Sequence, residues 1–360
     1  MKKTLLLTHE YFPFAGGIAT YCYGIFRNFN DQDYLVATDQ KMIQSGLNTI
    51  RVKLLTKFLR PRWLIGLWAV NKIVNKYAIQ QIFTPHIFPL GQIAYQLYEW
   101  YKIPYIISLH GLDINLALAK NPVLTKAILN HASQIVVNSQ TTKNLLPLNE
   151  IKTPITIITP YFDQRQADAS KVQAIQNQYG NQDIILTVGR LVKRKNQESV
   201  IRALAAMPEQ KITYLIIGDG PDRNRLQQLT EELKVADRVK FLTAISHDDL
   251  PNYYQAAKLF VMPTLQLNGD IEGYGIVYLE SAYYGLPAIV SRGSSAEEIF
   301  ISENSAIFVD PNNLQQLTDA IQSALANAEK RQTIADNSWA ITQKLEDWSA
   351  KAKILEKLLV

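Results

Sequence analysis

The segment 272–280 reads Glu-Gly-Tyr-Gly-Ile-Val-Tyr-Leu-Glu, and it is the most informative stretch of the chain. Two glycines follow the first carboxylate, and an apolar helical run carries the second. Glycines where a loop meets a helix let a ligand approach the backbone, and the free N–H groups of the first helical turn attract phosphate oxygens. Glu272 would lie in the loop and Glu280 about one and a half turns into the helix, so that both face one ligand. Because carboxylates suit hydroxyl groups, the segment suggests a nucleotide-sugar site; the plainer interpretation is an acidic loop and a solvated helix residue.

A basic loop lies upstream of this segment. The apolar strand predicted at 184–188 opens into a loop that contains Arg190 and Lys195. In open α/β sheets, ligands bind outside the carboxyl ends of the strands, where such a loop lies. Arginine offers a planar fork to phosphate and lysine a compact charge, so the pair would suit a diphosphate. Another predicted strand, 213–217, also ends in glycines, and a proline opens the helix after it.

In this order and spacing, these segments resemble the C-terminal half of glycosyltransferase family 4 (group 1), which are retaining enzymes of GT-B architecture. The resemblance runs through 188–191, 218–220, 262–264, 272–280, 285–287 and 293–297, and the glycine loop at 11–18 is similar to the family's N-terminal loop. It implies an α/β fold of two Rossmann-like, doubly wound domains that face a cleft. The sequence departs from the family at Ser294, where a second glycine is usual, and at Asn196, where glycine often follows the lysine.

Length and composition agree with two domains. The chain has 360 residues, of which 47% are hydrophobic and 19% charged, enough for two cores. Short Ile/Leu/Val runs alternate with amphipathic stretches, which is typical of parallel sheets covered by helices. The predicted strands are 4–8, 34–37, 105–108, 135–138, 184–188, 213–217, 239–242, 259–262, 288–290 and 306–309.

We expect an N-terminal, acceptor-binding domain at 1–165 and a donor-binding domain at 166–340. The resemblance implies that a last helix, at about 341–360, crosses back to the first domain. Pattern alone allows that helix to pack on the second domain equally well.

Several classes of site and of location are disfavoured. The single cysteine, Cys22, excludes an internal disulfide and a cysteine-based metal cluster. The first residues predict a β-strand rather than a signal peptide, and no apolar run approaches transmembrane length, so we expect a cytoplasmic protein. Asp31 and Asp33 offer an Asp-x-Asp metal pattern, but they lie in a polar turn after a predicted helix. We therefore expect no metal and no cofactor; the nucleotide sugar, of UDP or GDP type, is a substrate.

The N-terminal half adds two candidate elements. Gly16 and Gly17 follow the first strand and precede an apolar helix, so their N–H groups would suit phosphate; a tight turn without a ligand is the alternative. His110 closes the strand predicted at 105–108. The family carries a His-Gly element at this point, which implies contact with the transferred sugar, although a lone histidine is more often structural.

The resemblance implies that Glu280 binds the nucleotide ribose and that Glu272 lies near the donor sugar. Positive charge from Arg190 and Lys195 would stabilise the leaving diphosphate. The expected catalytic residues are Glu272, His110, Arg190 and Lys195. The expected donor-binding residues are Gly16, Gly17, Arg190, Lys195, Gly273, Tyr274, Gly275, Ile276 and Glu280.

The acceptor side carries a local charge pattern. No acidic residue lies between Gln40 and Tyr98, whereas basic residues and two tryptophans, Trp63 and Trp68, are concentrated in 51–76. A basic, aromatic helix is typical of contact with an anionic membrane surface, which would suit a lipid-linked acceptor. The alternative is a core-facing helix with a solvated basic rim. Nucleic acid is disfavoured as a partner because the charge is local and no nucleic-acid fold motif is present.

The sequence therefore predicts a retaining, metal-independent glycosyltransferase that moves a sugar to a glycan or lipid-linked acceptor, in the synthesis of a surface polysaccharide or glycolipid. It would be cytoplasmic or peripheral on the inner face of the membrane. The alternatives are a GT-B sugar-nucleotide epimerase and a non-catalytic nucleotide-sugar binding subunit. The Glu272–Glu280 spacing favours transfer over epimerisation.

Overall fold

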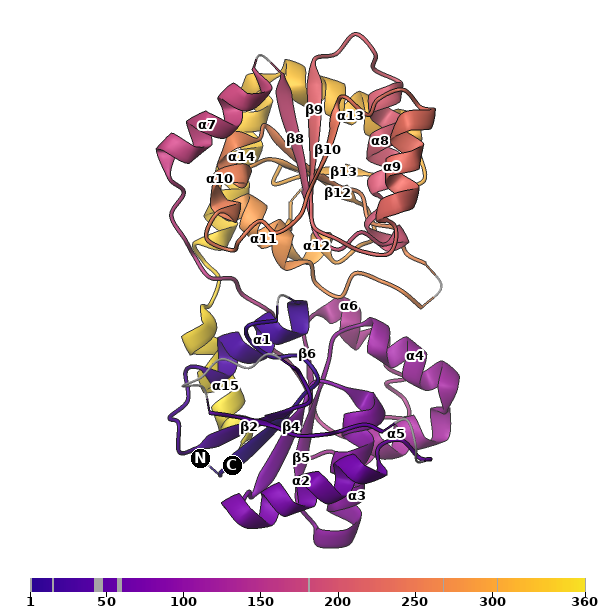
Figure 1. Cartoon of the computed structure of the whole chain (residues 1–360), viewed down its shortest axis with the longest axis vertical. Helices are drawn as coiled ribbons and strands as arrows, with labels where there is room; N and C mark the ends of the chain where they lie inside the picture. Colours follow the sequence, from indigo (N-terminus) through magenta and orange to yellow (C-terminus); the bar gives the residue numbers. More distant parts are fainter. Residues whose placement is uncertain are drawn as a thin grey trace. The chain divides into compact units, whose positions relative to one another are not determined.

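The structure is a computed structural model, and it describes residues 2–14, 16–41, 48–56, 60–180, 182–267, 269–302 and 304–359. The chain divides into two compact units, Met1–Phe162 with Glu346–Val360, and Asp163–Leu345. Both are α/β, in agreement with the predicted fold class (Figure 1). The boundary lies at Phe162 and Asp163 rather than at 165 and 166, and the return to the first unit begins at Glu346 rather than at 341.

The described residues of the first unit form a parallel sheet in the order β3-β2-β1-β4-β5-β6-β7. Strands β1, β2, β4, β5 and β6 are buried along their whole length, as expected for parallel strands covered on both faces. The strands are β1 Thr4–Leu7, β2 Tyr34–Thr38, β3 Thr49–Arg51, β4 Gln81–Thr84, β5 Tyr105–Leu109, β6 Gln134–Val137 and β7 Ile155–Ile157.

The helices of the first unit bury their apolar sides against this sheet, with α2, α3, α4 and α5 contributing to one core. They are α1 Gly17–Phe26, α2 Leu64–Tyr77, η1 Ile87–Gly91, α3 Gln92–Tyr101, α4 Leu112–Lys120, α5 Pro122–His131, α6 Gln140–Lys143 and α15 Trp348–Leu358. No helix among the described residues has both the length and the apolar character that crossing a bilayer requires.

Helix α15, at the C-terminal end of the chain, belongs to the first unit and lies beside α1 (Figure 1). Trp348 is 4% exposed, and a Cβ added to Gly24 of α1 would lie 2.3 Å from its ring. The Lys351 ammonium donates to the Thr159 hydroxyl at 2.7 Å, and the Gln81 amide donates to the Leu359 carbonyl at 3.1 Å. Packing and hydrogen bonds together hold the tail on this unit.

In the part of the second unit that the structure describes, parallel strands follow the order β10-β9-β8-β11-β12-β13. They are β8 Asp183–Val188, β9 Ile212–Ile217, β10 Val239–Leu242, β11 Leu259–Met262, β12 Ala288–Ser291 and β13 Ile307–Val309. The helices are α7 Ala169–Tyr179, η2 Lys193–Lys195, α8 Gln197–Ala205, α9 Arg223–Glu232, α10 Leu250–Ala256, α11 Ile276–Tyr283, α12 Ala296–Ile299, α13 Leu314–Ala326 and α14 Ala328–Thr342.

Each sheet has one point at which the direction of strand addition reverses. It lies between β1 and β4 in the first unit and between β8 and β11 in the second. Loops diverge at the carboxyl ends of the strands at such a switch point, and open α/β sheets bind ligands there. The loops after β8 and β11 carry Arg190, Lys195 and Glu272, so the fold brings these predicted residues to one edge of the second sheet.

Candidate active site

Glu272 is the centre of a cluster of charges at the switch point of the second sheet. Its carboxylate lies 2.7 Å from the Lys195 ammonium and also pairs with the Arg194 guanidinium. Arg194 Nε donates to Asp270 Oδ1 at 2.9 Å. Burial by itself would raise the pKa of the Glu272 carboxyl, but the charges of Lys195 and Arg194 outweigh it and hold that pKa below its usual value. Glu272 is therefore a charged, doubly paired carboxylate at neutral pH.

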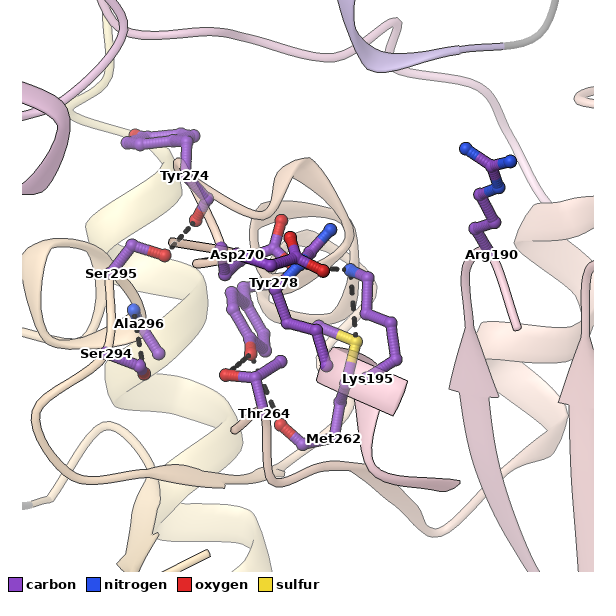
Figure 2. A network of polar contacts seen from close by, with 12 residues as sticks. Arg190, Lys195, Met262, Thr264, Asp270, Tyr274, Tyr278, Ser294, Ser295 and Ala296 are labelled. Atoms are coloured by element: carbon purple, nitrogen blue, oxygen red, sulfur yellow. Dashed lines mark hydrogen bonds and ion pairs between the residues drawn. The ribbon is translucent and has the colours of Figure 1, made fainter. Parts of the chain in front are cut away.

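Lys195 and Arg190, which lie in the same loop, occupy different environments. Lys195 is 7% exposed, and its side chain lies against Met262, with Nζ 3.5 Å from the sulfur (Figure 2). Arg190 is exposed and stands apart from the cluster in Figure 2. It forms no ion pair with any residue that the structure describes. The two predicted diphosphate ligands are thus a buried, already paired lysine and an exposed arginine.

The glycines after Glu272 shape the start of α11. Gly275 precedes the helix with φ +83°, and a Cβ added there would lie 2.5 Å from the Tyr278 ring. Both the left-handed backbone and the close ring require glycine at this position. No side chain caps α11, so no side-chain acceptor occupies the backbone N–H groups of its first turn. Tyr274 is buried, and its carbonyl accepts a hydrogen bond from the Ser295 hydroxyl at 3.0 Å (Figure 2).

Glu280 lies further along α11 in a different electrostatic environment. Tyr254 donates its hydroxyl hydrogen to Glu280 Oε2 at 2.6 Å, and the Tyr254 ring stacks on Tyr284 with centroids 5.4 Å apart. Burial raises the pKa of the Glu280 carboxyl, and the Tyr254 hydrogen bond and the charge of Arg165 oppose that shift only in part. No hydrogen bond or ion pair joins Glu272 to Glu280 among the residues that the structure describes.

The glycine loop of the first unit leads into α1. Gly16 is the N-cap residue and Gly17 the first residue of the helix. The structure shows neither a side-chain cap nor an acidic residue in the first turn of α1. A helix start of this kind tolerates an anion, because its N–H groups carry the positive end of the helix dipole.

His110 follows β5 and is a neutral histidine at neutral pH. Burial lowers its pKa to about 4. Its Nε2 lies 3.2 Å from the Ser108 hydroxyl, its backbone N–H donates to Asp113 Oδ1 at 3.1 Å, and the Tyr21 ring packs edge-on against the imidazole at 5.0 Å. Burial also raises the pKa of Asp113 to about 6, although four backbone N–H groups act against this shift.

Comparisons with known proteins identify the family of the second unit. The model of the family described as "Glycosyl transferases group 1" matches residues 168–339, which cover most of the second unit. The second unit of the chain is a group 1 glycosyltransferase domain.

Two curated relatives extend the similarity beyond that unit. The chain is 24% identical to a GDP-mannose-dependent alpha-(1-6)-phosphatidylinositol monomannoside mannosyltransferase of Mycolicibacterium smegmatis, over 99% of this chain and 97% of the relative. It is 25% identical to the alpha-monoglucosyldiacylglycerol synthase of Streptococcus pneumoniae, over 79% of this chain and 70% of the relative.

Solved structures confirm the GT-B fold. Sucrose-phosphate synthase from Thermosynechococcus elongatus superposes with a TM-score of 0.84 and 23% identity, covering 99% of this chain and 98% of that structure. Anabaena HepE in complex with UDP and glucose gives a TM-score of 0.84 and 21% identity, covering 100% of this chain and 99% of that one.

Sequence reasoning missed three residues of this glycosyltransferase that lie at the switch points. Arg194 was passed over within the basic run Lys193–Lys195, although it contacts Glu272. His9 and His86 follow β1 and β4, and their rings are 5.3 Å apart. Burial and, to a lesser degree, the neighbouring histidines lower the pKa of His86 to about 3. The signal that points to both histidines is their position two residues after a buried strand.

The basic segment 51–76 is not one helix. Arg51 ends β3, and α2 begins only at Leu64; Lys57 lies outside the described residues. Trp63 packs against the core, whereas Trp68 is 62% exposed, with the Lys72 ammonium 3.6 Å from its ring centroid. One of the two tryptophans is therefore available at the surface.

The Asp-x-Asp pattern shows ordinary turn chemistry. Asp33 accepts a hydrogen bond from the Asn30 amide at 3.2 Å. Within the described ranges, no group of three or more His, Cys, Asp or Glu side chains is arranged to hold a metal ion.

Proposed function

We propose that the chain is a retaining glycosyltransferase that moves a sugar from a nucleoside-diphosphate sugar, of UDP or GDP type, to a lipid-linked or glycan acceptor. The observation that carries the proposal is the Glu272 carboxylate, held by Lys195 and Arg194 beside the uncapped start of α11. Positive charge, helix N–H groups and a fixed carboxylate at one switch point suit a diphosphate and a sugar together.

Each predicted residue takes a defined part in this proposal. Lys195 and the exposed Arg190 stabilise the diphosphate as its charge grows in the transition state. The start of α11, with Gly273, Tyr274, Gly275 and Ile276, lets the donor approach the backbone. Glu280 accepts hydrogen bonds from the ribose. On the first unit, the uncapped start of α1 at Gly16 and Gly17 suits an anion, and His110 offers a neutral imidazole.

The environment of Glu272 supports transfer with retention and without a covalent sugar–enzyme intermediate. A carboxylate that is paired with two cations and has a lowered pKa is a weak base and a weak nucleophile. We infer that it orients hydroxyl groups of the donor sugar instead. The acceptor oxygen bonds to the anomeric carbon as the bond to the phosphate breaks, and the acceptor proton goes to that phosphate on the same face of the sugar. Lys195 and Arg190 neutralise the diphosphate, so we propose that the reaction requires no metal.

The relatives support a glycolipid acceptor. Two of them are named for transfer to a phosphatidylinositol mannoside and for the synthesis of a glucosyldiacylglycerol. In this chain the exposed Trp68 and Lys72 of α2 would contact the headgroups of an anionic membrane, as a peripheral protein on its inner face. A role in making a surface glycolipid or polysaccharide follows from such an acceptor.

Incubation of the purified chain with labelled donors tests the proposal. UDP-glucose and GDP-mannose are the first donors, because the HepE structure holds UDP and glucose and the mycobacterial relative is named for GDP-mannose. We expect slow release of nucleoside diphosphate without acceptor and faster release with membrane lipid extract. A new nucleotide sugar without acceptor would indicate an epimerase, and binding without turnover under any acceptor would indicate a binding subunit.

Two further measurements test the mechanism. The anomeric configuration of the product, determined by NMR, should equal that of the donor; inversion would contradict the retaining mechanism. EDTA should leave activity largely in place. Loss of activity that manganese restores would contradict metal independence and would bring Asp31 and Asp33 back as candidate ligands.

A further inference from the structure

Arg194 holds the loop that carries Glu272, and the roles above do not explain why Glu272 needs a second cation besides Lys195. Its guanidinium is 17% exposed and bonds to Asp270 at 2.9 Å and to Glu272. Its backbone carbonyl accepts the Leu265 N–H at 2.8 Å. One residue of the loop after β8 therefore contacts the loop after β11 at three points, and one of these points is the carboxylate proposed to face the donor sugar.

The Lys195 ammonium has two competing anionic partners, and Arg194 reduces this competition. Its ammonium lies 2.7 Å from Glu272, and the donor's diphosphate requires the same charge. A carboxylate beside the ammonium opposes a second anion, because charges in a buried site are only weakly screened. If Lys195 were the sole cation on Glu272, drawing it toward phosphate would leave a buried carboxylate without a counter-ion, which is costly. Arg194 pairs with the same carboxylate, which keeps its counter-ion and lowers that cost.

We propose that Arg194 is a positioning residue that acts as the standing counter-ion of Glu272 and thereby leaves the Lys195 ammonium available to the donor's diphosphate. The inference rests on the proposed function, since it assumes a nucleoside-diphosphate sugar as donor. Arg194 acts on the donor only through Glu272 and Lys195. Its planar fork holds Glu272 and Asp270 at once, which the single ammonium of a lysine does less well.

A double-mutant cycle separates this role from simple support of the loop. Binding of UDP, GDP, ADP and dTDP is measured by calorimetry for the wild type, Arg194→Met, Glu272→Gln and the double variant. We expect Arg194→Met to weaken binding of the preferred nucleotide about tenfold or more when Glu272 is present. In the Glu272→Gln background there is no carboxylate to neutralise, so the same change should alter affinity less than about twofold.

Two variants serve as controls. Lys193→Met removes a charge from the same turn, but Lys193 is exposed and does not pair with Glu272, so affinity should be nearly unchanged. Arg194→Lys keeps one charge and should restore part of the lost affinity. In assays with donor and acceptor, Arg194→Met should raise the donor KM by a larger factor than it lowers kcat.

Equal weakening in both backgrounds would show that Arg194 only supports the loop, and no weakening would remove it from donor binding; either result overturns the inference. Should Arg194→Met fail to fold, the same cycle with Arg194→Gln, which removes the charge but keeps a polar side chain, decides by the same criteria. A wild type that binds none of the four nucleotides overturns the proposed function, and the inference with it. A wild type that binds one of them while Arg194→Met binds equally well overturns the inference alone.

Discussion

Glu272 and Glu280 have opposite pKa shifts although one short segment carries both. Glu272 is held in its charged form by Lys195 and Arg194, while burial raises the pKa of Glu280 and Tyr254 donates a hydrogen bond to it. A charged, immobile carboxylate suits the reacting sugar, where orientation affects rate. A carboxylate that accepts one hydrogen bond from a tyrosine can also accept hydrogen bonds from the ribose hydroxyl groups. Such bonds would increase the affinity for the nucleotide.

This contrast predicts different kinetic effects for two isosteric changes. Glu280→Gln should weaken nucleotide binding about tenfold with a smaller effect on kcat. Glu272→Gln should lower kcat about 100-fold and leave nucleoside-diphosphate affinity the same or tighter, because Lys195 loses its carboxylate partner. Steady-state kinetics and calorimetry check both. A covalent sugar adduct accumulating in Glu272→Gln would contradict the assigned roles.

Arg190 and Lys195, the two cations proposed for the diphosphate, should differ in their contribution to stability. Arg190→Ala should weaken nucleotide binding and lower turnover about tenfold or more without changing the melting temperature, because Arg190 is exposed and makes no ion pair within the described residues. Lys195→Ala should also cost about 1–3 kcal/mol of unfolding free energy, because it removes one of the two cations on a buried carboxylate. Unchanged affinity and turnover in both variants would exclude these residues from the donor site.

His110 and Asp113 predict opposite dependences of stability on pH. The His110 pKa is about 4 in the folded chain against an ordinary 6.5, so the unfolded state binds more protons between these values and stability falls as pH drops through them. The Asp113 pKa is raised to about 6 from 3.8, so its protonation favours the folded state as pH falls. Urea unfolding at about pH 7 and about pH 4.5 should show a smaller acid loss for His110→Asn, by at most about 3 kcal/mol, and a larger one for Asp113→Asn.

At the scale of the element, the N-cap of α2 packs one tryptophan against the core, and the helix itself carries the other at the surface. Trp63 packs inward, while Trp68 and Lys72 stack on each other at the surface. An exposed indole next to basic side chains is suited to the headgroup region of a membrane. Leu67, Val70 and Val74 of the same helix are buried in the core. One face of α2 therefore packs inward, and the face with Trp68 is exposed.

Vesicle binding should therefore depend on α2. We expect sedimentation with vesicles to rise with anionic lipid and to fall with salt, because surface attraction is screened over about 10 Å at 0.1 M ionic strength. Replacing Arg60, Arg62, Lys72 and Lys76 by Gln should abolish binding yet spare donor hydrolysis. Trp68→Ala should weaken it, whereas Trp100→Ala, which removes another exposed tryptophan next to Glu99 on α3, should not. Equal sedimentation with neutral and anionic vesicles would favour an acceptor that is not in a membrane.

The elements that sequence reasoning found are those with strong local signals. All ten predicted strands are present, because each is an apolar run flanked by polar or turn residues. Strands β3, β4 and β7 were missed: β3 and β7 are three residues long, and β4 begins with Gln81. The sequence predicted the candidate active site from segments in which charged residues and glycines are neighbours, such as 272–280. Arg194 was not, because its importance comes from loops that meet only in the folded sheet.

At the scale of the whole molecule, the first unit is completed by a distant part of the chain. Trp348 fills the space that Gly24 leaves open on α1, and its ring approaches Tyr21 and Tyr161 edge-on. The indole therefore bridges the beginning of the unit and the segment where the chain leaves it. A change on either side of this contact should affect the stability of the unit as a whole.

Gly24→Ala tests that contact. The new methyl group would collide with the Trp348 ring, so we expect a loss of several kcal/mol of unfolding free energy, comparable to the about 3–5 kcal/mol for Trp348→Ala. In the Trp348→Ala background, Gly24→Ala should cost much less, because the ring is absent. Trp339→Ala is the control: its side chain is 48% exposed on α14, and the cost should be small. Additive losses, measured by urea denaturation, would contradict the contact.

The return of α15 to the first unit sets an order of events during synthesis on the ribosome. Residues 163–345 leave the exit tunnel as one continuous piece, so the second unit can finish folding while the first still lacks its last helix. The unit that is translated first is thus completed last. Until Trp348 emerges, the apolar surface of α1 around Gly24 is uncovered, and chaperones recognise surfaces of this kind. A chain whose translation terminates before Trp348 would leave this surface exposed.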